Sequence, residues 1–130
     1  MIENLTPQQA WQLLQQDKSA VLVDVRSQME YAYVGHPIGA AHIPWKEAPA
    51  WELNPNFVAE VKKLTPNTDT PILLLCRSGQ RSLSAAQALQ DAGYQRPINI
   101  SDGFEGPLDA NKHRNNVAGW RFCGLPWEQG

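Results

Sequence analysis

Along this chain, short apolar runs alternate with segments whose sequence is typical of helices. Val21–Val25 and Ile72–Leu75 consist mainly of aliphatic side chains, and Pro97–Ile100 is a third short run. Apolar runs of this length are typical of strands covered on both faces, because half-exposed strands alternate between apolar and polar residues. The pattern therefore predicts three buried strands, with a brief further strand at His42–Ile43.

Helices are predicted between these runs. Thr6–Gln9 and Ser27–Glu30 each have the spacing of a capping box, and Gly35 is expected to end the second helix. Two more helices are predicted over residues 54–64 and 82–92 from the period of their apolar residues. The side chains expected on buried helix faces are Ala10, Trp11, Leu14, Phe57, Val58, Val61, Leu64, Leu83, Ala86 and Leu89.

Alternation of strands and helices predicts an α/β fold with a central parallel sheet and helices on both faces. The length of 130 residues fits one domain, which we place at residues 4–127. The polar stretch Glu105–Ala118 lacks an apolar period and is expected to be a long, mobile surface loop. Trp120 and Trp127 are expected to hold the tail after it against the core.

Composition narrows the range of partners. The formal net charge is -2, which argues against a global attraction to nucleic acid or to an anionic membrane. No apolar run approaches the roughly 20 residues that cross a bilayer. Met1–Leu5 lacks the features of a signal peptide, so a cytoplasmic location is expected. In a reducing compartment the 2 cysteines would be free thiols.

The segment from Cys76 to Ser82 is the strongest candidate for chemistry. It follows an apolar strand and leads into a helix, the place where ligands of open α/β sheets bind. Loop amides, the helix N-terminus, Arg77 and Arg81 would favour the nucleophilic thiolate of Cys76. Gly79 would let the loop curl around an anion. The alternative, a structural core cysteine, fits poorly with two neighbouring arginines.

Several segments, in this order along the chain, resemble the rhodanese family. They cover about residues 4–127 and include the loop of Cys76, four intervening residues and Arg81. The matching segments are Val23–Arg26, Glu30–Tyr31, Gly35–Pro44, Cys76–Arg81, Gly93–Tyr94, Asn99–Phe104, Gly119–Trp120 and Gly124–Trp127. The resemblance implies a rhodanese-like α/β fold and a sulfurtransferase activity.

In such proteins the cysteine takes a sulfane sulfur from thiosulfate or a persulfide and passes it to cyanide or a thiol. The resemblance assigns this role to Cys76, with small sulfur donors and acceptors, and with a protein as a further possible acceptor. No metal or organic cofactor is expected. The residues expected to bind the substrate are Arg77, Ser78, Gly79, Gln80, Arg81 and Ser82.

Two other functions remain open from the sequence. A non-catalytic binding or regulatory module could keep the same fold, although inactive relatives commonly lack the cysteine that this chain retains. A phosphatase or arsenate reductase could use a similar loop that begins with a cysteine and contains an arginine. The cell-cycle phosphatases that resemble rhodaneses have five residues between Cys and Arg, however, and here there are four, with Ser82 at the position of the phosphatase arginine.

Charged residues near the first strand also match family positions. Asp24 lies near the end of that strand and is expected near the mouth of the pocket. Arg26 and Glu30 are expected to form a structural ion pair that fixes the following turn.

The second cysteine and the histidines are expected to have no part in the chemistry. Cys123 could resolve a modified Cys76 by forming a disulfide, but an ordinary, partly buried cysteine is favoured. His36 and His42 lack the spacing of metal ligands on one helix, and His113 is expected to be a solvated loop residue.

Overall fold

The computed structural model describes residues 2–47 and 49–130. Within them a five-stranded sheet has the order β1-β8-β7-β2-β4, and each neighbouring pair is parallel. Its strands are β1 (Glu3–Leu5), β2 (Val21–Asp24), β4 (Ala41–His42), β7 (Ile72–Leu75) and β8 (Pro97–Ile100). The predicted α/β fold with a central parallel sheet is confirmed. The short edge strand β1 has no strong pattern and was not predicted.

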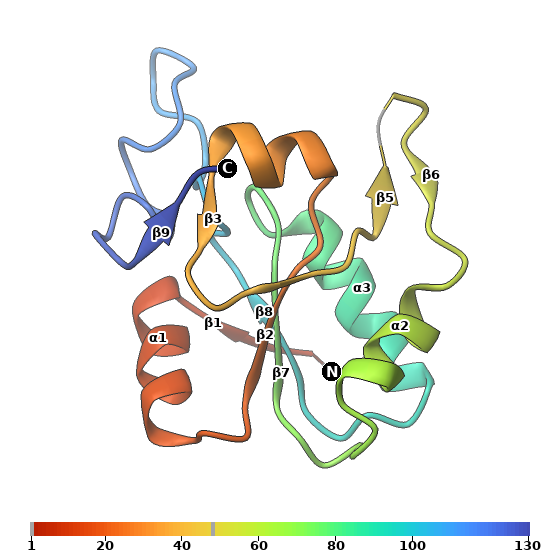
Figure 1. Cartoon of the computed structure of the whole chain (residues 1–130). Helices are drawn as coiled ribbons and strands as arrows, with labels where there is room; N and C mark the ends of the chain where they lie inside the picture. The colour runs from red at the N-terminus through yellow and green to blue at the C-terminus, as the bar shows by residue number, and fades with distance from the viewer. Residues whose placement is uncertain (1, 48) are drawn as a thin grey trace.

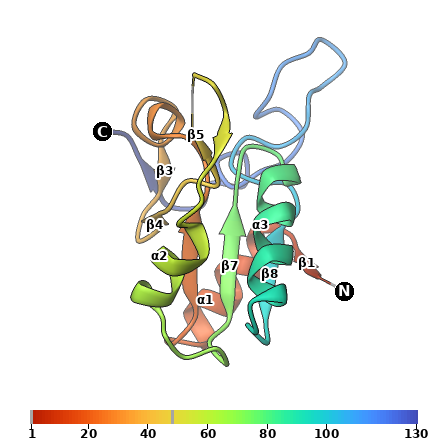
Figure 2. The same cartoon turned by 90° about the vertical axis from the view of Figure 1, so that its right-hand side faces the viewer.

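Helices cover both faces of this sheet, as the alternating pattern predicted. Figure 1 shows α1 (Pro7–Gln16) on one side of the sheet and α2 (Phe57–Leu64) with α3 (Gln80–Asp91) on the other. Figure 2 shows β7 behind and between α2 and α3. Among the described residues, no helix combines the length and apolar character needed to cross a bilayer.

Residues of β7 alternate between two hydrophobic cores. Ile72 and Leu74 belong to the core beneath α2 and α3, whereas Leu73 and Leu75 belong to the core beneath α1. All four residues are fully buried, as expected for a strand covered on both faces. Cys76, the next residue, is also buried and begins the loop that leads from β7 to α3.

The helix starts agree with the capping signals, but two expected core positions are wrong. Thr6 and Gln9 make the reciprocal bonds of a capping box, and so do Ser27 and Glu30. Leu64 and Leu83 are exposed. The helix α3 instead buries positions with i, i+3, i+4, i+7 spacing, and Leu83 lies outside this stripe. The buried residues of α3 are Ser82, Ala85, Ala86 and Leu89.

Smaller elements surround the carboxyl edge of the sheet. The chain leaves β2 through a π-helical turn, η1 (Glu30–Val34), which ends at Gly35 as predicted. Strands β3 (His36–Pro37) and β9 (Trp127–Glu128) pair antiparallel, as do β5 (Lys46–Glu47) and β6 (Glu52–Leu53). Strands of two residues are too short to leave a periodic signal in the sequence.

The C-terminal tail is held in place by tryptophan, as expected. Trp120 is fully buried, lies edge-on to Trp11 at 6.0 Å, and donates its indole N–H to the Pro126 carbonyl. Trp127 packs edge-on against Phe104 with ring centroids 6.0 Å apart. The tail thereby reaches β3 and closes the fold beside η1.

The polar stretch of residues 105–118 contains neither helix nor strand. Asp109 organises part of it by accepting hydrogen bonds from the backbone of Asn111 and His113 and from the Asn116 side chain. His113 is exposed, as expected.

We predict that amide hydrogen exchange is faster in residues 105–118 than in β2 and β7, because the loop lacks a buried hydrogen-bond ladder. Exchange followed by mass spectrometry at peptide resolution measures this difference. Equal protection of the loop and the two strands would contradict the prediction.

Candidate functional site

Cys76 directly follows the last residue of β7. Figure 2 shows the turn that leads from the end of β7 into α3. Cys76 is only 1% exposed. Its Sγ accepts a hydrogen bond of 3.1 Å from the backbone N–H of Gly79 and lies 3.2 Å from Oγ of Ser82. The thiol is therefore held between a loop amide and a hydroxyl.

Glycine is required at the turn that supplies this amide. Gly79 has φ 106°, and a Cβ there would collide with the backbone carbonyl of Ser101. The segment after β8 also forms backbone hydrogen bonds with this loop. Phe104 donates its N–H to the Cys76 carbonyl at 2.8 Å, and Glu105 donates to the Arg77 carbonyl at 3.0 Å. The close approach of Gly79 to Ser101 and the backbone hydrogen bonds from Phe104 and Glu105 thus fix the loop conformation.

Behind Cys76 a chain of polar side chains crosses the sheet. The Ser82 hydroxyl donates to Oδ1 of Asn99 at 2.5 Å, and Nδ2 of Asn99 donates to Oδ1 of Asn4 at 2.9 Å. Ser82 was expected to bind substrate, but it is fully buried and does not line the cavity described below. It faces the sulfur from within the protein, because the inward stripe of α3 includes this position.

Asn99 was not among the predicted site residues. It lies in β8, between Ile98 and Ile100, and is buried. A polar side chain inside a buried strand must find a hydrogen-bond partner, so this position could have been singled out from the sequence. The identity of the partner, Ser82, could not.

A cavity of about 760 Å³ opens beside Cys76. Of the residues expected to bind substrate, Arg77, Ser78, Gln80 and Arg81 line it, and Gly79 contacts the sulfur through its amide. The full lining is Ser27, Met29, Glu30, Tyr33, Val34, Lys46, Trp51, Cys76, Arg77, Ser78, Gln80, Arg81, Glu105 and Arg114.

Arg81 is paired with a carboxylate inside this cavity. Its two terminal nitrogens donate to the two carboxylate oxygens of Glu30 at 2.7 and 2.9 Å. Burial raises the pKa of Glu30, but the hydrogen bonds and charge of Arg81 outweigh this effect and lower the pKa to about 2. Glu30 therefore stabilises the fold at pH values above its unfolded pKa of 4.5, and this contribution is lost as the pH falls toward 2.

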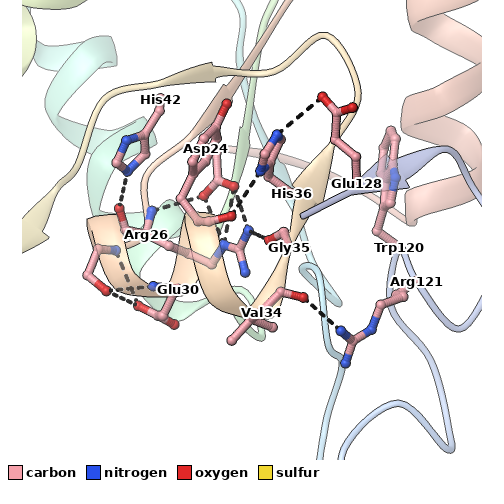
Figure 3. A network of polar contacts seen from close by, with 12 residues as sticks. Asp24, Arg26, Glu30, Val34, Gly35, His36, His42, Trp120, Arg121 and Glu128 are labelled. Carbon is pink, nitrogen blue, oxygen red and sulfur yellow. Dashed lines mark hydrogen bonds and ion pairs between the residues drawn. The ribbon is translucent and has the colours of Figure 1, made fainter. Parts of the chain in front are cut away.

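The expected ion pair between Arg26 and Glu30 is wrong. Arg26 instead contacts Asp24, with its Nη2 2.7 Å from Oδ2, and both side chains are fully buried (Figure 3). Residues two apart on an extended chain point to the same side, so Asp24 meets Arg26 directly. Glu30 lies in η1 and reaches Arg81, which the sequence separates from it by 51 positions.

Asp24 is consequently absent from the pocket mouth, where the sequence suggested it. Its carboxylate also accepts the backbone N–H of Arg26, and Arg26 donates to the Gly35 carbonyl (Figure 3). The guanidinium of Arg26 stacks over the Phe104 ring at 4.4 Å. The pair joins the end of β2 to the end of η1 and, through Phe104, to the segment that forms backbone hydrogen bonds with the loop after β7.

The histidines and Cys123 lie outside the cavity lining. His36 and His42 stack on Tyr31 at 3.8 and 4.4 Å, and each bonds a backbone carbonyl through a ring nitrogen. Cys76 and Cys123 are both free thiols within the part of the chain that the structure describes. Burial and the charge of Asp102 raise the pKa of Cys123, which disfavours its thiolate.

Both the sequence and the fold of this chain resemble those of known proteins. A model of the Rhodanese-like domain matches residues 6–109. Over 132 aligned residues the chain is 36% identical to the uncharacterised protein RP600 of Rickettsia prowazekii, covering 98% of each. It is 36% identical over 104 residues to the thiosulfate sulfurtransferase GlpE of Haemophilus influenzae, covering 80% of this chain and 86% of that protein. The crystal structure of Rv0390 from M. tuberculosis matches with a TM-score of 0.89 and 42% identity over 98% of both chains.

We predict that Arg26→Met lowers the free energy of unfolding by about 3–5 kcal/mol, because it leaves the buried Asp24 carboxylate without its partner. Urea denaturation measures the change. Arg96→Met is the matched control, since Arg96 pairs with Glu3 at the surface, where such a pair is worth less than about 1 kcal/mol. Similar losses in both variants would contradict the prediction.

Proposed function

Because the chain belongs to the rhodanese-like domain family, we propose that it is a sulfurtransferase whose nucleophile is Cys76. We place the functional domain at residues 4–127. The observation that carries the proposal is the position of the Cys76 thiol, which lies at a cavity and accepts a hydrogen bond from the Gly79 amide. A backbone N–H aimed at sulfur stabilises a thiolate and needs no movement when the charge forms.

The proposed reaction has two displacements at sulfur. The Cys76 thiolate attacks the outer sulfur of thiosulfate, a new S–S bond forms, and the electron pair of the broken S–S bond leaves with sulfite. Cys76 is then a persulfide. An acceptor such as cyanide or a thiolate attacks the terminal sulfur, takes it, and returns the electron pair of that bond to the Cys76 thiolate.

Ser82 has the geometry to respond to the charge on Cys76. A hydroxyl carries a single proton, and Ser82 directs its own toward Asn99, so its lone pairs face the sulfur. When Cys76 is a thiolate, rotation of the Ser82 O–H toward Sγ gives the sulfur a second hydrogen-bond donor. Ser82 and Asn99 are accordingly proposed as positioning residues, and not as substrate contacts.

The remaining loop residues are proposed to meet the donor from the cavity side. Arg77, Ser78 and Gln80 line the cavity directly after the nucleophile. Arg81 also lines it, but its charge is shared with Glu30, so it contributes less to binding an oxyanion than an unpaired arginine would. The acceptors proposed are small thiols, cyanide or a thiol on a protein.

A phosphatase or arsenate reductase is the less favoured function. The four residues between Cys76 and Arg81 make a shorter loop than that of the related phosphatases. In addition, Arg81 forms an ion pair with Glu30. A non-catalytic module is disfavoured because Cys76 is present and accepts a hydrogen bond from the Gly79 amide.

We predict that thiosulfate adds the mass of one sulfur atom to the protein and that cyanide removes it again. Intact-mass spectrometry follows both steps. Cys76→Ser should abolish the addition, and Cys123→Ser is the matched control that should retain it, since Cys123 does not line the cavity. Sulfur transfer that survived in Cys76→Ser would rule out the assignment of the nucleophile.

We predict negligible hydrolysis of a small aryl phosphate, because the short loop leaves too little room for a phosphoryl group in line with Sγ. The release of the phenol under the conditions of the sulfur-transfer assay measures this. A rate of aryl phosphate hydrolysis above that of thiosulfate turnover would replace the sulfurtransferase proposal with the phosphatase one.

A further inference from the structure

The chain continues beyond the segment that matches the Rhodanese-like domain, which ends at residue 109. Residues 110–130 return to the domain and contact the backbone of η1. Arg121 donates to the Val34 carbonyl at 2.9 Å (Figure 3), and Gly130 donates its N–H to the Ala32 carbonyl at 3.0 Å. Val34 lines the cavity beside Cys76, so this C-terminal segment supports one wall of the cavity.

The C-terminal segment also contributes a side chain to the cavity, and that side chain is Arg114. Its Nη1 donates to the Gly106 carbonyl at 2.8 Å. Gly106 in turn donates its N–H to the Arg77 carbonyl at 3.2 Å. Arg114 is thereby connected, through a single residue, to the loop that begins with Cys76.

The backbone around Arg114 holds its guanidinium at the cavity. Asn115 donates its N–H to the Glu105 carbonyl at 2.9 Å, and Asp109 accepts the His113 N–H at 2.9 Å. A Cβ on Gly106 would collide with the Ala118 carbonyl, so the two arms of this loop lie in direct contact. The loop of residues 105–118, light blue in Figure 2, projects from the same edge of the sheet as the turn from β7 into α3.

Arg114 retains the charge and the donors that Arg81 shares with a carboxylate. Glu30 takes up the charge of Arg81 through two hydrogen bonds. Arg114 forms no ion pair with any residue in the ranges 2–47 and 49–130. A guanidinium has five N–H donors in a planar fork, and such a fork matches the oxygens of a tetrahedral oxyanion. Arg114 is therefore better suited than Arg81 to bind an anion in the cavity.

We propose that Arg114 binds the sulfonate oxygens of thiosulfate and stabilises the sulfite that leaves. This inference rests on the proposed sulfurtransferase function. The Cys76 thiolate forms a new S–S bond to the outer sulfur, and the electron pair of the broken S–S bond leaves with sulfite. Arg114 transfers no proton and forms no covalent bond. Its positive charge faces the negative charge that accumulates on the leaving group.

Rapid-quench mass spectrometry measures the rate constant with which thiosulfate adds one sulfur to Cys76. Arg114→Met should lower this rate constant roughly 10- to 100-fold, the scale of a hydrogen bond between charged groups. Arg114→Lys should restore only part of the loss, because an ammonium group is a point charge without the planar fork of donors.

Lys112→Met is the matched control for net charge. It removes one positive charge from the same loop, but Lys112 is exposed and does not line the cavity. Its rate constant with thiosulfate should stay within about two-fold of the parent value, because a distant surface charge is screened by salt. An equal loss in Lys112→Met and Arg114→Met would overturn the inference, since general attraction of the anion would then explain both.

A second measurement separates binding of the oxyanion from support of the loop, because Arg114 also bonds Gly106. Iodoacetamide is uncharged and reacts with the same thiolate. The rate constant of alkylation is measured at its high-pH plateau in a Cys123→Ser background, so that only Cys76 reacts. Arg114→Met should change this plateau less than about two-fold, and melting curves establish that each variant is folded.

Failure of this inference differs from failure of the proposed function. Equal rate constants with thiosulfate in the parent and in Arg114→Met would overturn the inference and leave the sulfurtransferase function intact. Parallel losses with thiosulfate and iodoacetamide would also overturn it, because Arg114 would then only support the loop. If thiosulfate adds no sulfur to the parent protein, the proposed function is wrong and the inference falls with it.

Discussion

Burial of β7 on both faces is the constraint on which the rest of the structure depends. The side chains of this strand alternate between two cores, and neither core is complete without it. The strand can therefore neither slip nor tilt without exposing leucine or isoleucine to water. Cys76, the next residue, is therefore held in a fixed position, and the Gly79 amide lies within hydrogen-bond distance of its sulfur.

The polar groups around Cys76 are divided between the inside and the outside of the protein. Ser82 and Asn99 form a buried path behind the sulfur, where low polarity strengthens each hydrogen bond. Arg81 and Glu30 face the cavity and join the helix α3 to η1. The first turn of α3 thus carries Ser82, which belongs to the polar path behind the Cys76 sulfur, and Arg81, which belongs to the ion pair that faces the cavity.

The ion pair between Arg81 and Glu30 strongly affects the net charge of the cavity. Since Glu30 takes up the charge of Arg81, the cavity combines a modest positive excess with apolar side chains from η1 and the β5–β6 hairpin. A second pair, the fully buried Asp24 and Arg26, holds the end of β2 and the Gly35 carbonyl in place. The Asp24–Arg26 pair is local along the chain, whereas the Glu30–Arg81 pair joins two elements that only folding brings together.

The sequence by itself determined the strands β2, β7 and β8, the first capping box and the position of Cys76 at a strand end, because these follow from local periodicity and turn chemistry. Only the tertiary structure decided that Glu30 meets Arg81. Glu30 and Arg81 are 51 residues apart, and no local rule relates them. The inward stripe of α3 likewise placed Ser82 behind the sulfur, because which face of a helix is buried depends on what packs against it.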